Sequence, residues 1–81
     1  MSRDIDRLRD MAFFAAVARE GSFTKASQAL GVPTSTLSRR ITEFEADIKI
    51  KLFNRSTRRV TLTETGARYL QQIDDIVQQA K

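Results

Sequence analysis

Residues 24–41 read TKASQALGVPTSTLSRRI, and this stretch decides the expected fold. Ser27, Gly31 and Leu37 follow one another at intervals of four and six residues, so a small residue, a turn glycine and an aliphatic residue come in order. Glycine permits a tight turn and a small side chain permits close crossing, so we expect two short helices to cross here. The stretch therefore predicts a helix-turn-helix, whose second helix is presented to a groove of double-stranded DNA.

The sequence before and within this stretch predicts two helices. Apolar residues recur at spacings of three and four from about residue 4 to residue 20, and Gly21 is expected to end this first helix. Ser22 or Thr24 is expected to cap a second helix, which is about seven residues long and ends at Gly31. A helix this short depends on tertiary packing.

A third helix is expected to begin at Thr34, because Pro33 has no amide proton to donate and disfavours helix at the residue before it. The Thr34 hydroxyl is expected to cap the free amides of the first turn. The predicted inward face comprises Leu37, Ile41, Phe44 and Ile48. The opposite face comprises Thr34, Ser35, Ser38, Arg39 and Thr42.

That outward face has short side chains, is rich in hydroxyl groups and carries one long cation. It can approach a groove floor closely, with hydroxyls donating to phosphates or base edges and Arg39 forking onto guanine or a phosphate. The alternative is an ordinary solvent face with Ser and Thr as neutral filler, where Glu, Lys and Gln would be more usual.

Residues 51–63, KLFNRSTRRVTLT, predict a small hairpin, or wing, with strands over 51–55 and 60–63 joined by a polar stretch. Arg55, Arg58 and Arg59 are left near the loop, where a cation can enter the negative potential of a minor groove. Basic hairpin tips also keep edge strands from pairing, and this alternative stays open.

Thr63 is expected to cap a last helix that begins near Glu64 and meets no stop signal before the chain ends. Its apolar stripe is longer than the first helix alone is expected to cover, which predicts pairing with a second copy. Two such helices would form a two-fold dimer with recognition helices about 34–36 Å apart. The alternative is packing against the first helix of the same chain, expected mainly for Tyr69 and Leu70. The predicted dimer interface comprises Leu70, Ile73, Ile76, Val77 and Ala80.

The charge of the chain is unevenly distributed. Residues 39–68 hold eight of the 14 basic and four of the 10 acidic residues, so this segment accounts for the whole net charge of +4. The excess follows the helix-turn-helix, as expected for a half that faces a polyanion. A solvated basic surface is the alternative explanation.

The composition argues against catalysis. The chain has no cysteine and no histidine, which removes thiolate and imidazole chemistry, and its adjacent Asp74 and Asp75 are better explained by solubility. We therefore expect no enzymatic activity, no metal and no cofactor. No apolar run approaches the roughly 20 residues that span a bilayer, and residues 1–10 do not resemble a signal peptide. A soluble, cytoplasmic protein without a membrane partner is expected.

Several motifs together resemble one family. AREGSF, TKASQALGVPTSTLSRRI, LFNR and TLTETG occur in the order found in the N-terminal DNA-binding domain of LysR-type bacterial transcriptional regulators, and the resemblance covers residues 8–81. It implies a mainly α, winged helix-turn-helix domain over residues 1–63, with a three-helix core and a two-stranded wing. Residues 64–81 would then form a linker and dimerisation helix. A C-terminal effector domain that senses a small molecule would be absent from this chain.

The resemblance also implies how the chain acts. A homodimer would bind an interrupted palindrome upstream of a promoter, with recognition helix 34–48 in the major groove and wing 52–63 at the minor groove. The family's DNA-contacting positions near the start of the recognition helix correspond to Thr34, Ser35, Thr36, Ser38 and Arg39. Its wing contacts correspond to Arg58, and then to Arg55 and Arg59.

Three residues depart from the family pattern. Ser27 stands where alanine is usual, and Pro33 stands where a capping serine is common. Lys49 replaces a glycine that ends the recognition helix, which costs on the order of 1 kcal/mol if the left-handed conformation is kept. The prediction is sequence-specific binding of double-stranded DNA. The alternative is a protein-interaction module that uses the basic face and the last helix.

Overall fold

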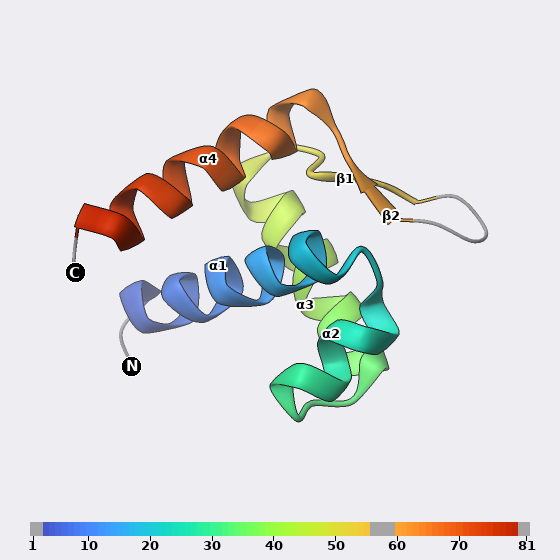
Figure 1. The fold of residues 1–81 in the computed structure, drawn as a ribbon. Coiled ribbons are helices and arrows are strands. Elements are labelled where there is room, and N and C mark those ends of the chain that lie inside the picture. Colours follow the sequence, from blue (N-terminus) through green and yellow to red (C-terminus); the bar gives the residue numbers. More distant parts are fainter. Residues whose placement is uncertain (1–2, 56–59, 80–81) are drawn as a thin grey trace.

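The computed structural model describes residues 3–55 and 60–79, with side chains described for residues 7–55 and 60–75. Within these ranges four helices and two strands follow one another in the order α1, α2, α3, β1, β2, α4 (Figure 1). Their bounds are α1 Arg3–Glu20, α2 Phe23–Leu30, α3 Thr34–Ile48, β1 Phe53–Arg55, β2 Val60–Leu62 and α4 Glu64–Gln79. The mainly helical fold with a two-stranded wing is as predicted. Among the described residues, no helix is long and apolar enough to cross a membrane.

The turns on either side of α2 form as the sequence predicts. Gly21 ends α1 with a φ of 65°, and Gly31 ends α2 with a φ of 73°, a conformation that glycine adopts without strain. Of the two candidate caps for α2, the structure selects Ser22, whose hydroxyl accepts from the Lys25 amide at 3.1 Å. These two turns fix where α2 begins and ends.

The start of α3 is correct in position, but its predicted cap is wrong. The helix begins at Thr34, and the preceding Pro33 occupies the cap position without a side-chain hydrogen bond. A capping side chain must come from the residue before the first helical one, and Thr34 is already helical. Its hydroxyl oxygen instead lies 2.8 Å from the Ser27 hydroxyl oxygen of α2.

The end of α3 keeps the geometry expected of a glycine. Lys49 has φ 57° and ψ 38°, in the left-handed region, and is the one non-glycine residue with positive φ in the described part of the chain. The amides of Lys49 and Ile50 both donate to the Glu45 carbonyl, which closes the helix. The departure at Lys49 therefore leaves the helix end in place, at the cost of strain in one residue.

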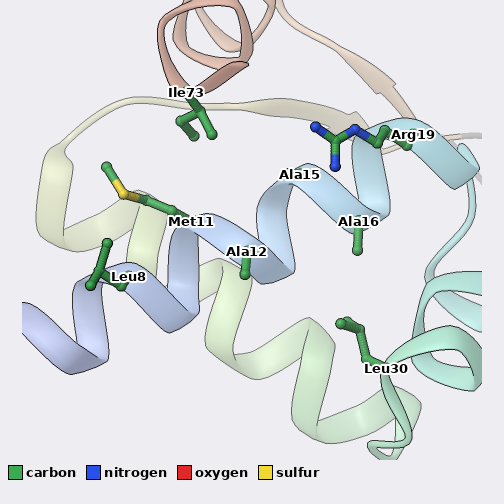
Figure 2. Close-up of a pocket in the computed structure, with 8 residues that line it drawn as sticks. All are labelled: Leu8, Met11, Ala12, Ala15, Ala16, Arg19, Leu30 and Ile73. Carbon is green, nitrogen blue, oxygen red and sulfur yellow. The ribbon is translucent and has the colours of Figure 1, made fainter. Parts of the chain in front are cut away.

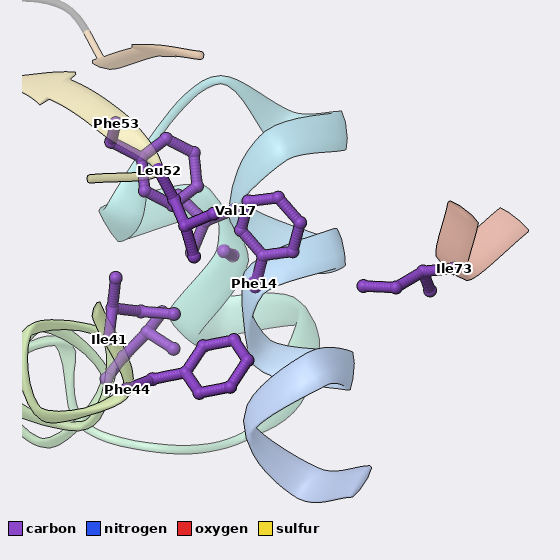
Figure 3. Close-up of a cluster of buried hydrophobic side chains, with 9 residues drawn as sticks. Phe14, Val17, Ile41, Phe44, Leu52, Phe53 and Ile73 are labelled. Carbon is purple, nitrogen blue, oxygen red and sulfur yellow. The ribbon is translucent and has the colours of Figure 1, made fainter. Parts of the chain in front are cut away.

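The core lies where α1 and α3 meet the start of the wing (Figure 3). The Phe14 ring of α1 packs against the Phe53 ring of β1, with centroids 5.3 Å apart, and against the Tyr69 ring of α4, with centroids 5.7 Å apart. The largest fully buried side chains are Phe14, Val17, Leu37, Ile41, Phe44, Leu52 and Phe53. The predicted inward positions of α3 thus form the core, with Ile48 only partly buried at its edge.

The two strands form an antiparallel pair in which Phe53 faces Leu62 and Arg55 faces Val60. They are shorter than the predicted 51–55 and 60–63, and the Leu52 amide just before β1 donates to the Glu45 carboxylate of α3. Thr63 caps α4 as predicted, its hydroxyl accepting from the Gly66 amide at 2.9 Å. Gly66 lies against the backbone of Leu52, where an added Cβ would come within 2.2 Å of the Leu52 carbonyl oxygen. This close approach explains the glycine in the TLTETG motif.

Candidate nucleic-acid interface

The first half of α3 carries an exposed outer surface. Thr34, Ser35 and Arg39 are exposed, whereas Thr36 and Ser38 are partly buried. All five predicted contact residues therefore lie on the first half of α3, and three of them are open to a ligand. The opposite side of the helix is sealed into the core, so the helix presents a single face outward.

Arg39 is held only weakly. Its guanidinium lies 3.7 Å from the Glu43 carboxylate one turn later, and the two side chains are 63% and 60% exposed. An exposed ion pair of this spacing contributes little to stability, about 0.5 kcal/mol or less. Arg39 can therefore leave Glu43 for a stronger anion at little cost.

Arg40 has a different role from its neighbour. Its guanidinium donates to the Asp10 carboxylate of α1 at 3.2 Å, and both side chains are largely covered. The pair ties the recognition helix to α1 on the side away from the exposed hydroxyls. Of these two adjacent arginines of α3, Arg39 thus lies on the outer surface and Arg40 holds α3 to α1.

The wing is attached to α3 through the Glu45 carboxylate. One oxygen, Oε2, accepts from the backbone amides of Leu52 at 2.8 Å and Phe53 at 3.2 Å. The other, Oε1, accepts from the Arg55 guanidinium at 3.3 Å. Glu45 therefore fixes the start of β1 against the recognition helix, and we call these contacts the wing clamp.

Arg55 completes the wing clamp, although the sequence suggested it only as a DNA contact. Its guanidinium donates to the Thr42 hydroxyl at 3.1 Å and lies over the Phe23 ring, 5.1 Å from the centroid. With Glu45 on its other side, Arg55 joins α2, α3 and the wing. Contact between Arg55 and DNA stays a prediction. The other predicted wing contacts, Arg58 and Arg59, lie outside the described residues.

Sequence reasoning missed Glu45, Thr42 and Phe23 as partners of Arg55. Nothing in their spacing indicates the contacts, because the partners come from α2 and α3 and meet Arg55 of β1 only in the folded chain. The one signal was a carboxylate directly after the buried Phe44. A charged residue at the edge of a core is usually paired.

The C-terminal helix packs more closely on its own chain than predicted. Ile73, predicted for a dimer interface, is only 8% exposed and belongs to the core beside α1. Leu70 is partly buried against the same core, in agreement with the packing on its own chain that was expected for it, and Asp74 accepts from Arg19 of α1 at 2.6 Å. The apolar stripe of α4 is covered as far as Ile73 because α1 runs alongside α4, as Figure 1 shows. The side chains of Ile76 and Val77, and the whole of Ala80, lie outside the described residues.

These features define a class of protein. Helices α2 and α3 form a helix-turn-helix with an outward-facing second helix, and an antiparallel wing follows at once. This is the arrangement of winged helix-turn-helix DNA-binding domains.

The comparisons with known proteins identify the family. Residues 8–67 match the family model described as bacterial regulatory helix-turn-helix protein, lysR family, and the chain belongs to this family. It is 40% identical over 79 residues to an HTH-type transcriptional repressor of Pseudomonas aeruginosa strain UCBPP-PA14, covering 89% of this chain and 25% of that protein. It is 42% identical over 67 residues to the HTH-type transcriptional activator AaeR of Escherichia coli K12, covering 83% and 22%. The chain thus spans about a quarter of the length of these relatives.

Solved structures agree with this assignment. The BenM DNA-binding domain in its complex with catB site 1 DNA is similar with a TM-score of 0.84 and 34% identity, covering 90% of this chain and 81% of that one. The CbnR DNA-binding domain in its DNA complex gives a TM-score of 0.81 and 32% identity, covering 89% and 83%. This chain is therefore a DNA-binding domain of the LysR type, from a family of transcriptional regulators.

Proposed function

We propose that this chain recognises specific sites in double-stranded DNA by inserting the first half of α3 into the major groove, with the wing beside the adjacent minor groove. The observation that carries the proposal is the outer face of α3, where Thr34, Ser35 and Arg39 are exposed on a helix whose other side is fixed in the core. Phosphate contacts would set the register, and a few side chains on this face would supply discrimination between bases.

The test is a titration of the best site selected from a random duplex library. Arg39→Ala should weaken binding by about 1–3 kcal/mol, because one charge-assisted or bidentate contact is lost. Arg68→Ala is a matched control, since Arg68 forms the same kind of exposed ion pair, with Glu64 at 3.3 Å, but lies on α4. Equal effects of the two substitutions would remove Arg39 from the interface.

The alternative is a module that binds an acidic protein through its basic face. The two functions differ in their response to salt and to sequence. Duplex affinity should fall steeply with rising salt and should differ between sequences, as phosphate neutralisation and base contacts require. A flat response on both counts would favour the protein partner.

We also propose that the active form is a homodimer that pairs through the later part of α4. An apolar groove of about 410 Å³ supports this proposal (Figure 2), because it runs along α1 beside Ile73 and includes Leu8, which is 65% exposed. A second copy of the chain that packed on this apolar surface would remove it from water. Val77→Glu should give a folded monomer with weaker binding to a palindromic site. A dimer in sedimentation of this variant would place the interface elsewhere.

The whole regulator would be a cytoplasmic, non-enzymatic protein that carries a C-terminal effector domain for a small molecule. The support is that this chain corresponds to about a quarter of relatives that are themselves transcriptional regulators. Binding of a small molecule by the full-length protein but not by this chain would be the expected result in calorimetry.

A further inference from the structure

Two hydroxyl groups in series join α2 to the first residue of α3. The Ser27 hydroxyl donates to the Thr24 carbonyl at 2.8 Å, and its oxygen lies 2.8 Å from the Thr34 hydroxyl oxygen. Ser27 is only 5% exposed, whereas Thr34 is exposed at the outer end of the recognition helix. The series therefore begins inside the domain and ends at the proposed DNA surface. We call it the hydroxyl relay.

The relay has a direction. A hydroxyl group carries one proton, and a carbonyl oxygen can only accept a hydrogen bond. The Ser27 hydroxyl donates its proton to the Thr24 carbonyl. In the hydrogen bond between Ser27 and Thr34, the Thr34 hydroxyl is therefore the donor and the Ser27 oxygen is the acceptor. The Thr34 oxygen is then left with its lone pairs alone. Toward any further group, Thr34 is a hydrogen-bond acceptor.

This direction decides what Thr34 can recognise. Phosphate oxygens, guanine O6 and N7 and thymine O4 are all acceptors, and they cannot bond to a hydroxyl that has no free proton. The donors that face the major groove are the exocyclic amino groups, N6 of adenine and N4 of cytosine. Residues at the start of a recognition helix are the ones that reach base edges.

We propose that Ser27 makes Thr34 a specificity-determining residue, which accepts a hydrogen bond from the amino group of adenine or cytosine and does not bind phosphate. The proposal rests on the proposed insertion of α3 into the major groove. It gives a function to Ser27, which is the one buried polar residue in the part of the chain whose side chains are described. Alanine at this position would leave the Thr34 hydroxyl free to rotate and to donate.

The first experiment removes the base amino group. The preferred duplex is selected from a random library, and each adenine or cytosine of a half-site is replaced in turn by purine or 2-pyrimidinone, which lack only that group. At one position the parent chain should lose about fivefold to tenfold in affinity, the effect of a single base contact. At that position the Thr34→Val variant should lose no more than about twofold in affinity when the amino group is removed. The Thr34→Ser variant, which keeps the hydroxyl, should lose as much affinity as the parent chain.

The second experiment breaks the relay. With Ser27→Ala, the loss at the same position should shrink to about twofold, since the freed hydroxyl can also turn toward an acceptor. Ser22→Ala is the control, because it removes another structural hydroxyl of α2, the one that caps the helix, without touching Thr34. Thermal unfolding followed by circular dichroism shows that each variant is folded. If the Ser27→Ala variant does not fold, the Thr34 variants still test the proposal, because Thr34 is exposed and its substitution leaves the core unchanged.

Two results would overturn the assignment. If Thr34→Val weakened all sites equally and left every base preference in place, the hydroxyl would be a phosphate donor. If the folded Ser27→Ala variant lost as much affinity as the parent chain when the amino group is removed, the hydroxyl relay would not control Thr34. A parent chain that binds all duplexes alike would instead refute the proposed function itself, which is a separate and visible outcome.

Discussion

Glu45→Ala should lower the free energy of unfolding by about 2–3 kcal/mol. The carboxylate accepts from the amides of Leu52 and Phe53, in residues that are fully buried, and from the guanidinium of Arg55. A buried donor left without its partner costs about 1–3 kcal/mol, and partial access of water to this site places the total for two amides toward the lower end. In a domain of this size the change corresponds to a drop of roughly 10–20 °C in the unfolding temperature.

The assay is chemical denaturation followed by circular dichroism, with Glu43→Ala as the matched control. Glu43 lies two residues earlier on the same helix, is 60% exposed and pairs only loosely with Arg39. Its removal should cost about 0.5 kcal/mol or less. A similar small cost for Glu45→Ala would show that water replaces the carboxylate, and would refute the reasoning that the wing clamp holds β1 to α3.

Two backbone positions give further predictions. Lys49→Gly should raise the free energy of unfolding by about 0.5–1 kcal/mol, because relief of the left-handed conformation outweighs the entropy of glycine; a lower midpoint in denaturant would contradict this. Gly66→Ala should cost about 3 kcal/mol, since the new Cβ would overlap the Leu52 carbonyl oxygen 2.2 Å away. Helix propensity alone predicts the opposite sign for Gly66→Ala, so a rise in unfolding temperature would show that the backbones can separate.

Local signals in the sequence account for much of the fold. The turn at Gly31, the start of α3 after Pro33 and the cap at Thr63 all depend on the conformation of one or two neighbouring residues, and the structure confirms each. The cap assigned to Thr34 failed because a shift of one residue separates a capping position from a helical one. Helix boundaries are the least certain part of such predictions for this reason.

Contacts between segments were harder to predict. The wing clamp and the burial of Ile73 depend on where α3 meets β1 and on how far α1 runs beside α4, which apolar spacing within one helix does not encode. The outward face of α3 could be predicted, because it follows from the periodicity of a single element. The different roles of Arg39 and Arg40 could not be predicted, because they depend on Asp10 of α1 lying beside Arg40 in the folded chain.

The attachment of α3 at both ends bears on how regulators of this type diversify. Its first residue is bound through Ser27, and its last turn is bound through Glu45 to the wing. Ser35 and Arg39, by contrast, are exposed between these anchors. Exchange of such outward side chains leaves the supports of the helix unchanged, so with the proposed mode of DNA binding a gene duplicate would acquire a new operator by a few substitutions without first having to regain stability.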